Sequence, residues 1–106
     1  MNKTLIAASL AALMATGAVA QEIGASIARF DDNGLTVMRN GMTAHMETLS
    51  GVNLQMEDAQ DDVARQLDQI NNFIASGVDA IIVNAVDTNA TEAMTQAAAA
   101  AGVPLV

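Results

Sequence analysis

The sequence predicts an α/β fold: a parallel β-sheet of strand order 2-1-3-4 with helices on both faces, in three layers. Two observations predict it. Strand-like and helix-like segments alternate three times between Ile23 and Ala101, and the strand-like segments begin at residues 23, 52, 79 and 103. This spacing of 24 to 29 residues leaves room for one helix in each connection, which is typical of right-handed crossovers between parallel strands.

The expected strands occupy residues 23–28, 52–57, 80–83 and 103–106. Residues 52–57 alternate strictly between apolar and polar side chains, which is typical of an edge strand or of one with a single covered face. Residues 80–83 are all apolar, as expected for a central strand that is covered on both faces. These two patterns place the second strand at the edge and the third inside the sheet.

Three helices are expected between the strands, each with an apolar stripe at spacings of three and four residues. Asp61 and Asp62 are expected in the first turn of the second helix, and Asn89 with Glu92 would form a capping box for the third. Glycines in the left-handed conformation are expected to end the helices, at Gly51, Gly77 and Gly102. The stripes are Leu35, Met38, Met42, Met46 and Leu49, then Val63, Leu67, Ile70 and Ile74, then Ala90, Ala93, Met94, Ala97, Ala98 and Ala101.

Residues 1–20 are expected to be an export signal that is cleaved after Ala20. Lys3 supplies a positive start, residues 5–15 are apolar, and Ala18-Val19-Ala20 has the small-x-small pattern of a cleavage site. A membrane anchor is the alternative, but the apolar run is shorter than the roughly 20 residues that span a bilayer. Residues 21–106 would then form one domain. Because the sequence has no cysteine for a lipid anchor or a disulfide, we expect this domain to be free in the periplasm.

The charge of the mature chain excludes some classes of partner. The net charge of the 106 residues is −8, and loss of the leader removes one lysine and no acid, leaving 86 residues with a charge of −9. Such a domain repels phosphate backbones and anionic lipid, so neither nucleic acid nor a membrane is an expected partner. The glycines lack the spacing of a phosphate loop, and the one histidine has no partner for a catalytic triad. A binding protein without a cofactor, rather than an enzyme, is therefore expected.

Polar side chains follow each expected strand, at the edge where open parallel sheets collect ligands. Asp31 and Asp32 follow the first strand, Asp58 the second, and Asn84 and Asp87 the third. One carboxylate can accept from two neighbouring hydroxyls, and charged hydrogen bonds are the stronger kind, so these positions suit the vicinal diols of sugars and polyols. The alternative is that these residues only form turns and caps, which Asp and Asn favour.

The stretch from Ile23 to Val106 resembles the first lobe of periplasmic sugar-binding proteins of the galactose- and ribose-binding type. The resemblance rests on a combination of short blocks, none of which is specific alone. Asp31-Asp32-Asn33 with Val86-Asp87-Thr88 is most similar to the galactose and glucose type and to inositol- or rhizopine-binding relatives. The blocks are Ile23 to Ile27, Phe30 to Asn33, Arg39 to Gly41, Asp58 to Asp62, Gln66 to Ile70, Gly77 to Asn84, Val86-Asp87 and Ala101 to Pro104.

This resemblance implies a solute-binding component of an ABC importer, with two lobes that close on a sugar or a cyclic polyol such as an inositol. It would present the ligand to ABC permease subunits or to a chemoreceptor. Residues 21–106 would be an incomplete first lobe of that two-lobe fold.

The resemblance also implies which residues bind the ligand. Asp32 matches a first-lobe aspartate that binds sugar hydroxyls, and Asp31 and Asp87 are expected beside it. Ala28 and Gly34 stand where the galactose type has aromatic side chains that contact the ligand. Phe30 either substitutes for those rings or packs beneath the turn. Together with the strand-end positions, the resemblance makes Asp32, Asp31, Phe30 and Asp87 the expected ligand-binding residues.

Two other classes of function share this kind of fold, which does not decide function by itself. A flavodoxin-like enzyme or phosphoacceptor would hold Mg²⁺ at Asp31 and Asp32. It also needs an acceptor aspartate after the third strand, where Asn84 and Ala85 stand, and a lysine, which the mature chain lacks. A ligand-sensing regulator would carry a DNA-binding headpiece in place of the leader. Arg29 could pair with the neighbouring aspartates or simply face water, and the latter is commoner.

Overall fold

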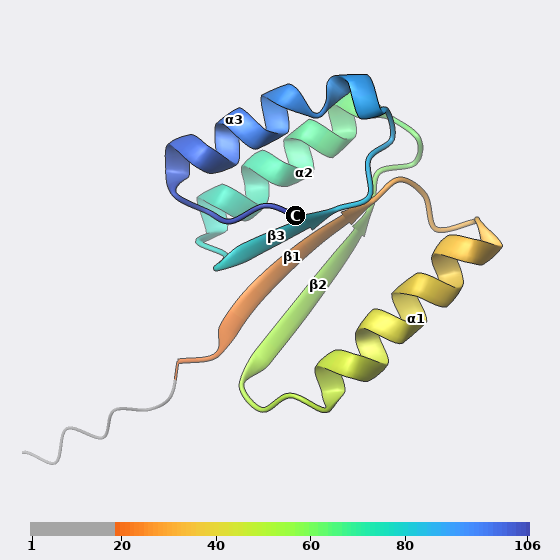
Figure 1. Ribbon diagram of the computed structural model, residues 1–106, viewed down its shortest axis with the longest axis vertical. Coiled ribbons are helices and arrows are strands. Elements are labelled where there is room, and N and C mark those ends of the chain that lie inside the picture. Colours follow the sequence, from red (N-terminus) through yellow and green to blue (C-terminus); the bar gives the residue numbers. More distant parts are fainter. Residues whose placement is uncertain (1–18) are drawn as a thin grey trace, which may run out of the picture.

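The computed structural model describes residues 19–106. Most of the expected leader, residues 1–18, therefore lies outside the described residues. Strands and helices alternate as the sequence predicts (Figure 1). The elements are β1 (Gln21–Ile27), α1 (Asn33–Glu47), β2 (Val52–Asp58), α2 (Val63–Ser76), β3 (Ala80–Val83), the 3₁₀ helix η1 (Thr88–Ala90) and α3 (Glu92–Ala101). None of the helices in residues 19–106 is long and apolar enough to cross a bilayer.

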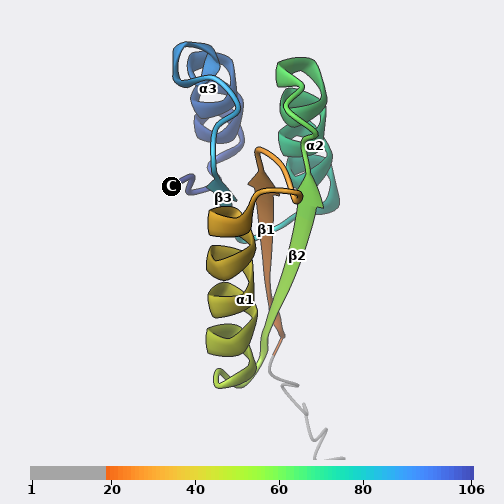
Figure 2. The ribbon, with the colours of Figure 1, turned by 90° about the vertical axis from the view of Figure 1, so that its right-hand side faces the viewer.

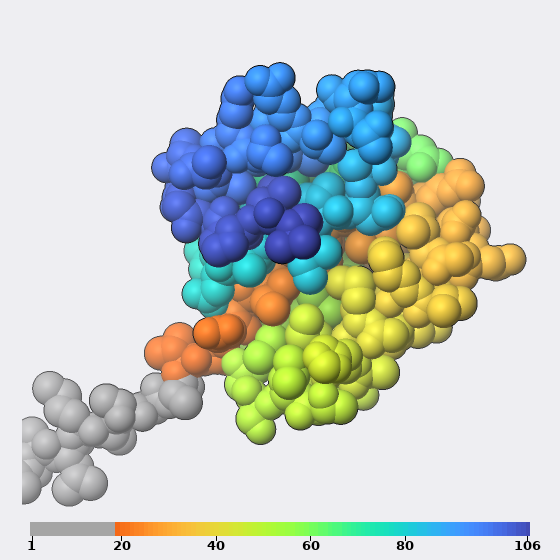
Figure 3. All heavy atoms as spheres, in the orientation of Figure 1, coloured from red at the N-terminus to blue at the C-terminus, as the bar shows by residue number. Residues whose placement is uncertain are grey.

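The sheet is parallel throughout, in the order β2-β1-β3. The predicted order of the first three strands is therefore confirmed. The predicted fourth strand is reduced to one parallel bridge between Ile81 and Leu105. Backbone hydrogen bonds from Ile81 N to Pro104 O and from Val106 N to Ile81 O hold this segment beside β3. It lies at the surface next to α3, as the dark blue atoms in Figure 3 show.

Two helices cover one face of the sheet and one helix covers the other (Figures 1 and 2). Gly24 of β1 contacts Phe73 of α2, and its register partner Ile81 packs in a cluster with Met94 of α3. Side chains of alternate residues point to opposite faces. Leu54, which pairs with the residue before Gly24, accordingly faces α1. The three predicted layers are present.

The core lies between the sheet and the α2–α3 layer. Its buried centre is the cluster Ile70, Phe73, Ile81 and Met94. The predicted stripe of α2 is only partly right, because the residues that are buried against the sheet are Gln66, Gln69, Ile70 and Phe73.

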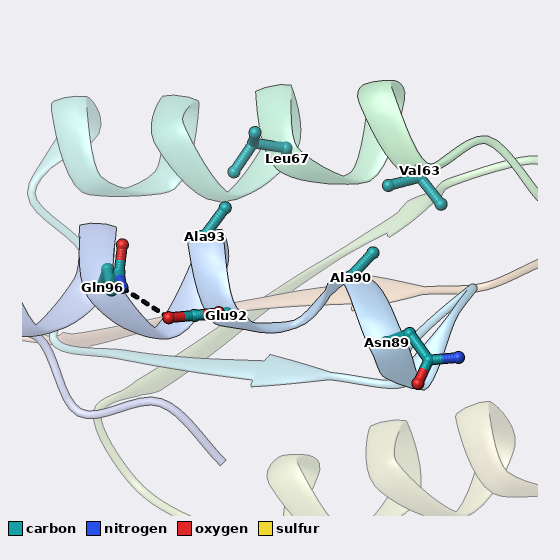
Figure 4. Close-up of a pocket in the computed structure, with 7 residues that line it drawn as sticks. All are labelled: Val63, Leu67, Asn89, Ala90, Glu92, Ala93 and Gln96. Carbon is teal, nitrogen blue, oxygen red and sulfur yellow. Dashed lines mark hydrogen bonds between the residues drawn. The ribbon is translucent and has the colours of Figure 1, made fainter.

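Two further residues of the predicted α2 stripe face the neighbouring helix. Val63 and Leu67 point toward Ala90 and Ala93, across a hollow of about 510 Å³ between α2 and the η1–α3 segment (Figure 4). Two helices that lie side by side on one face need apolar contacts with each other as well as with the sheet. The apolar surface of α2 is therefore wide, because part of it contacts the sheet and part of it faces α3.

Helix α1 has no buried residue. Met42 and Met46 of its predicted stripe are half-buried, whereas Met38 is 36% exposed. Leu49 lies beyond the end of the helix and is 42% exposed. The apolar stripe of this helix is therefore only partly buried, because α1 is the one helix on its face within the described residues and reaches mainly the edge strand β2.

The helix ends agree with the sequence in part. Gly77 and Gly102 end α2 and α3 with φ of 78° and 70°. Gly51 also has a positive φ, but α1 has already ended at Thr48, so the glycine belongs to the turn that enters β2. Asp62 is the N-cap of α2 rather than part of its first turn, and Asp61 precedes it.

The predicted capping box of Asn89 with Glu92 does not form. Asp87 caps a short 3₁₀ helix by accepting from Asn89 N, and Thr91 then stands at the N-cap of α3 without a side-chain capping bond. Because Asn89 lies inside that 3₁₀ turn, its side chain is not at the position from which it could cap α3.

Gly24→Ala is expected to lower the free energy of unfolding by about 1–3 kcal/mol, because the added methyl would overlap the Phe73 ring. A Cβ at Gly24 would lie 2.5 Å from Phe73 Cγ. Gly41→Ala in α1 is the matched control, since a Cβ there meets nothing within 4 Å and alanine favours a helix by up to about 1 kcal/mol. Urea unfolding measures both changes, and shifts of the same sign in the two variants would contradict this packing.

Candidate functional site

Three loops leave the sheet at the carboxyl ends of β1, β2 and β3 and lie at one edge of the molecule (Figure 1). We call this edge the rim; it comprises residues 28–32, 58–61 and 84–87. The parallel strand direction brings the three loops together, as predicted. The loops after β1 and β2 surround a hollow of about 410 Å³, which is lined by Arg29, Phe30, Asp31, Asp58, Gln60 and Asp61.

Arg29 is the positive centre of the rim. Its Nη1 donates to Asp61 Oδ2 at 3.0 Å, its Nε lies 3.7 Å from Asp31 Oδ1, and its Nη2 lies 3.7 Å from Asp32 Oδ2. The hydrogen bond and charge of Asp61, followed by the charge of Asp31, raise the pKa of the Arg29 guanidinium above its ordinary value. Because Arg29 and Asp61 are about half exposed and Asp31 is more exposed still, solvent screens the pairs, which orient the carboxylates more than they stabilise the fold. The commoner outcome, an arginine that only faces water, is wrong here.

One carboxylate oxygen of Asp32 caps a helix, and the other lies outside that bond. Its Oδ1 accepts from Leu35 N at 2.9 Å and so caps α1. This bond is the main cause that lowers the pKa of the Asp32 carboxyl below its ordinary value. Burial opposes the shift, and the Gly34 N–H and the charge of Arg29 add smaller lowering contributions. Oδ2 lies on the side of Arg29, outside the capping bond. The carboxylate is therefore ionised and held in one orientation.

Asp31 and Asp87 occupy different parts of the rim. The Asp31 side chain is 87% exposed and lines the hollow beside Arg29. Asp87 lies after β3, where its Oδ1 accepts from Asn89 N at 2.8 Å. Asp58 makes a similar local bond to Gln60 N at 2.8 Å. For Asp58 and Asp87, the turn and cap role that the sequence left open is thus present, and each keeps a second carboxylate oxygen.

Phe30 lies in the wall of the hollow and is half-buried. The guanidinium of Arg39 stacks on its ring, with Cζ 3.8 Å from the ring centroid. Arg39 Nη2 also donates to Phe30 O at 3.1 Å. One face of the ring is therefore occupied by the protein itself, and the side chain also borders the hollow.

The loop after β2 contains two residues with a strained backbone, and both line the hollow. Gln60 and Asp61 both have a left-handed backbone, with φ of 53° and 55°, which costs about 1–2 kcal/mol for each residue that is not glycine. Bonds from Gln60 N to Asp58 Oδ1 and from Asp61 N to Ala28 O, both 2.8 Å, hold this conformation. The second bond also fixes this loop to the end of β1.

A buried polar network lies beneath the rim and was not predicted from the sequence. It consists of Ser26, Gln66 and Gln69, which are 0%, 0% and 8% exposed. The signal was the helical spacing of Gln66, Gln69 and Phe73, which share the buried face of α2. A search for apolar stripes passes over this signal, because glutamine counts as polar.

The rim presents hydrogen-bond acceptors together with a donor. Within residues 19–106, no group of three or more potential metal ligands converges. The guanidinium of Arg29 stands against both Asp31 and Asp32, where the Mg²⁺ of the alternative hypothesis would have to lie. Carboxylate oxygens and a guanidinium supply acceptors and donors respectively, and a vicinal diol needs both.

Comparison with known proteins gives relatives along the whole chain. The chain is 57% identical over 106 residues to a Rhizobium meliloti protein named as a candidate rhizopine-binding protein. This alignment covers 100% of this chain and 34% of that protein. It is 29% identical over 112 residues to the D-galactose/methyl-galactoside binding periplasmic protein of Haemophilus influenzae, again over 100% of this chain and 34% of the other.

The fold also has close structural relatives. A solute-binding protein of an ABC transporter from Bacillus halodurans, solved with bound myo-inositol, superposes with a TM-score of 0.79 at 34% identity. The match covers 85% of this chain and 31% of that one. The chain spans about a third of the length of these proteins. Residues 23–106 match the periplasmic binding protein domain. The chain therefore belongs to the periplasmic binding protein domain family.

Proposed function

We propose that residues 21–106 form part of the first lobe of a solute-binding protein that takes a sugar or a cyclic polyol. A second lobe would close over the rim, and the closed protein would deliver its ligand to ABC permease subunits or to a chemoreceptor. Residues 1–20 would direct export to the periplasm, with cleavage after Ala20.

The observation that carries this proposal is the fixed carboxylate of Asp32. Its capping bond to Leu35 N sets the orientation of the carboxylate, and Arg29 lies 3.7 Å from the oxygen that remains. The carboxyl is a charged acceptor at neutral pH, and its lowered pKa extends the ionised form to lower pH. The myo-inositol-bound relative, at 34% identity, supports a cyclic polyol as the ligand class.

Asp31, Asp87 and Phe30 would complete the first-lobe contacts. Asp31 lines the hollow and would accept from outward-pointing hydroxyls. Asp87 would approach from the loop after β3 through the carboxylate oxygen that lies outside its capping bond. Phe30 would offer one ring face or its edge to the apolar side of the ligand ring, because Arg39 covers the other face.

A ligand panel tests the proposed class of ligand. The complete product of the gene is titrated with myo-inositol, D-galactose and D-ribose, with cyclohexanol as a six-membered ring that carries one hydroxyl. We expect at least one of the three polyhydroxylated compounds to raise the melting temperature, because a ligand at 100 times its Kd adds about 2.7 kcal/mol to stability. Cyclohexanol should not raise it. The proposal fails if none of the three compounds does so.

Asp32→Asn separates the two roles of this residue. Asparagine caps a helix about as well as aspartate, so the melting temperature should change little, whereas the affinity for the compound that the panel identifies should fall about tenfold to a hundredfold. Asp32→Ala should lower both. Calorimetric titration and thermal melts measure the two effects.

Asp62 supplies the matched control. It caps α2 in the same way, with Oδ1 accepting from Arg65 N at 3.0 Å, but it lines a separate hollow with Arg65 and Asp68. Asp62→Ala should cost about 1 kcal/mol of stability and leave the affinity unchanged. Equal losses of affinity in Asp32→Asn and Asp62→Asn would show that the effect is one of net charge and not of the site.

The pH dependence of stability should show the lowered pKa of Asp32. Folding favours the ionised carboxylate, so its contribution is complete above the ordinary pKa of 3.8 and is lost as the pH falls through the lower pKa of the folded state. The melting temperature of the wild type minus that of Asp32→Asn should therefore stay constant from pH 7 to about pH 5 and decrease below about pH 4. Thermal melts across this range measure it, and a difference that increases toward low pH is inconsistent with the capping bond.

A further inference from the structure

Beneath the rim, one serine and two glutamines form a closed polar network inside an otherwise apolar layer. Ser26 lies near the end of β1, and Gln66 and Gln69 lie on the sheet-facing side of α2. Ser26 and Gln66 have no exposed surface, and Gln69 has 8%. Burying amides in this way is unfavourable unless their polar atoms find partners.

The amide of Gln66 clamps the segment that follows β3. Its Nε2 donates to Asn84 O at 3.0 Å, and its Oε1 accepts from Val86 N at 2.9 Å. The two bonds hold the residues on either side of Ala85, immediately before Asp87. Asn84 is in turn tied to β1, because its Oδ1 accepts from Ala28 N at 3.2 Å.

The amide of Gln69 does the same for the end of β2. Its Nε2 donates to Asp58 O at 2.8 Å. The hydroxyl of Ser26 joins the two amides, since it donates to Gln69 Oε1 at 2.7 Å and accepts from Gln66 Nε2 at 3.0 Å. Each oxygen and nitrogen of the two amides therefore has a hydrogen-bond partner. The ends of β1, β2 and β3 are linked by one continuous series of side-chain hydrogen bonds.

Such a network favours one arrangement of its members, because a shift of either loop leaves a buried donor or acceptor unpaired. An apolar core would tolerate small displacements, since dispersion contacts have no direction. The position of the network is also specific: every backbone atom that the two amides hold lies within three residues of Asp58 or Asp87.

We propose that Gln66 and Gln69 are positioning residues of the ligand site. They set the places of the loops after β3 and β2 relative to β1, and so they set ligand affinity without reaching the ligand. The inference has two halves. The affinity half, that the two glutamines affect ligand binding, rests on the proposed function. The positional half, that they hold the two loops in place, concerns the protein without ligand and is tested separately.

Gln66→Met tests the positional half by amide hydrogen exchange on the complete gene product without ligand. Methionine is close in size and flexible, but it removes the bonds to Asn84 O and Val86 N. We expect exchange at Val86 N to rise about tenfold at a temperature well below the melting point. Ile70→Val and Ile70→Ala are the controls, because Ile70 is equally buried on the same helix and packs in the apolar cluster.

Gln69→Met should give a different pattern. It frees Asp58 O, so exchange should rise at Ala59 N and Asp61 N, which donate to the end of β1, and less at Val86 N. This second variant also keeps the test usable if Gln66→Met does not fold. The positional half is overturned if the glutamine variants and the Ile70 variants of equal stability give the same exchange pattern.

The affinity half is measured by calorimetric titration with myo-inositol, D-galactose and D-ribose. For the compound that binds the wild type, Gln66→Met and Gln69→Met should lose about 2- to 30-fold in affinity. Ile70 variants matched for melting temperature should keep it. Affinities that follow melting temperature alone, in all variants, overturn the positioning role. Binding of none of the three compounds by the wild type overturns the proposed function, and with it the affinity half, while the exchange data still decide the positional half.

Discussion

The hydroxyl of Ser26, bonded on either side to a buried glutamine amide, is the interaction on which the arrangement of the rim depends. Parallel strands bring three loop ends to one edge, but strand pairing stops at Asp58 and Val83 and does not by itself position the loops beyond those residues. The amides of Gln66 and Gln69 continue the order beyond the strands, into backbone that would otherwise be held by few bonds. Because the three side chains are buried, water cannot replace any of these bonds. A polar atom that lost its partner would stay unpaired in the folded protein.

The rim above this network combines local capping with charge. Asp32, Asp58 and Asp87 each use one carboxylate oxygen to hold a nearby backbone N–H. That use fixes where the second oxygen of each points. Arg29 lies among Asp31, Asp32 and Asp61 and offsets part of the acidic charge that would otherwise accumulate there. The same residues thus serve the turn and remain available as hydrogen-bond acceptors.

The two faces of the sheet are covered unequally. On one face α2 and α3 bury Ile70, Phe73, Ile81 and Met94. On the other, α1 lies along the edge strand and buries no residue fully. Close contact of Phe73 with Gly24 explains why the first face packs so tightly, since any side chain at that position would displace the ring.

Alternation of apolar runs with helical periodicity was enough to predict the α/β class, the three layers and the parallel order of β2, β1 and β3, because strand burial and crossover length leave few other topologies. The end glycines of α2 and α3 were predictable for a local reason, the left-handed backbone at Gly77 and Gly102. The position of Asp31 and Asp32 at the carboxyl edge followed from the same topology.

Only the tertiary structure decided which face of α2 meets the sheet and what the polar residues on that face do. Gln66 and Gln69 are buried because partners from three strand ends, distant in sequence, are present to satisfy their amides. The pairing of Arg29 with Asp61 and the stacking of Arg39 on Phe30 likewise join residues from separate elements or turns. A pattern of polar and apolar letters records the average solvation of a side chain, whereas burial of a polar group depends on partners that only the folded chain brings together.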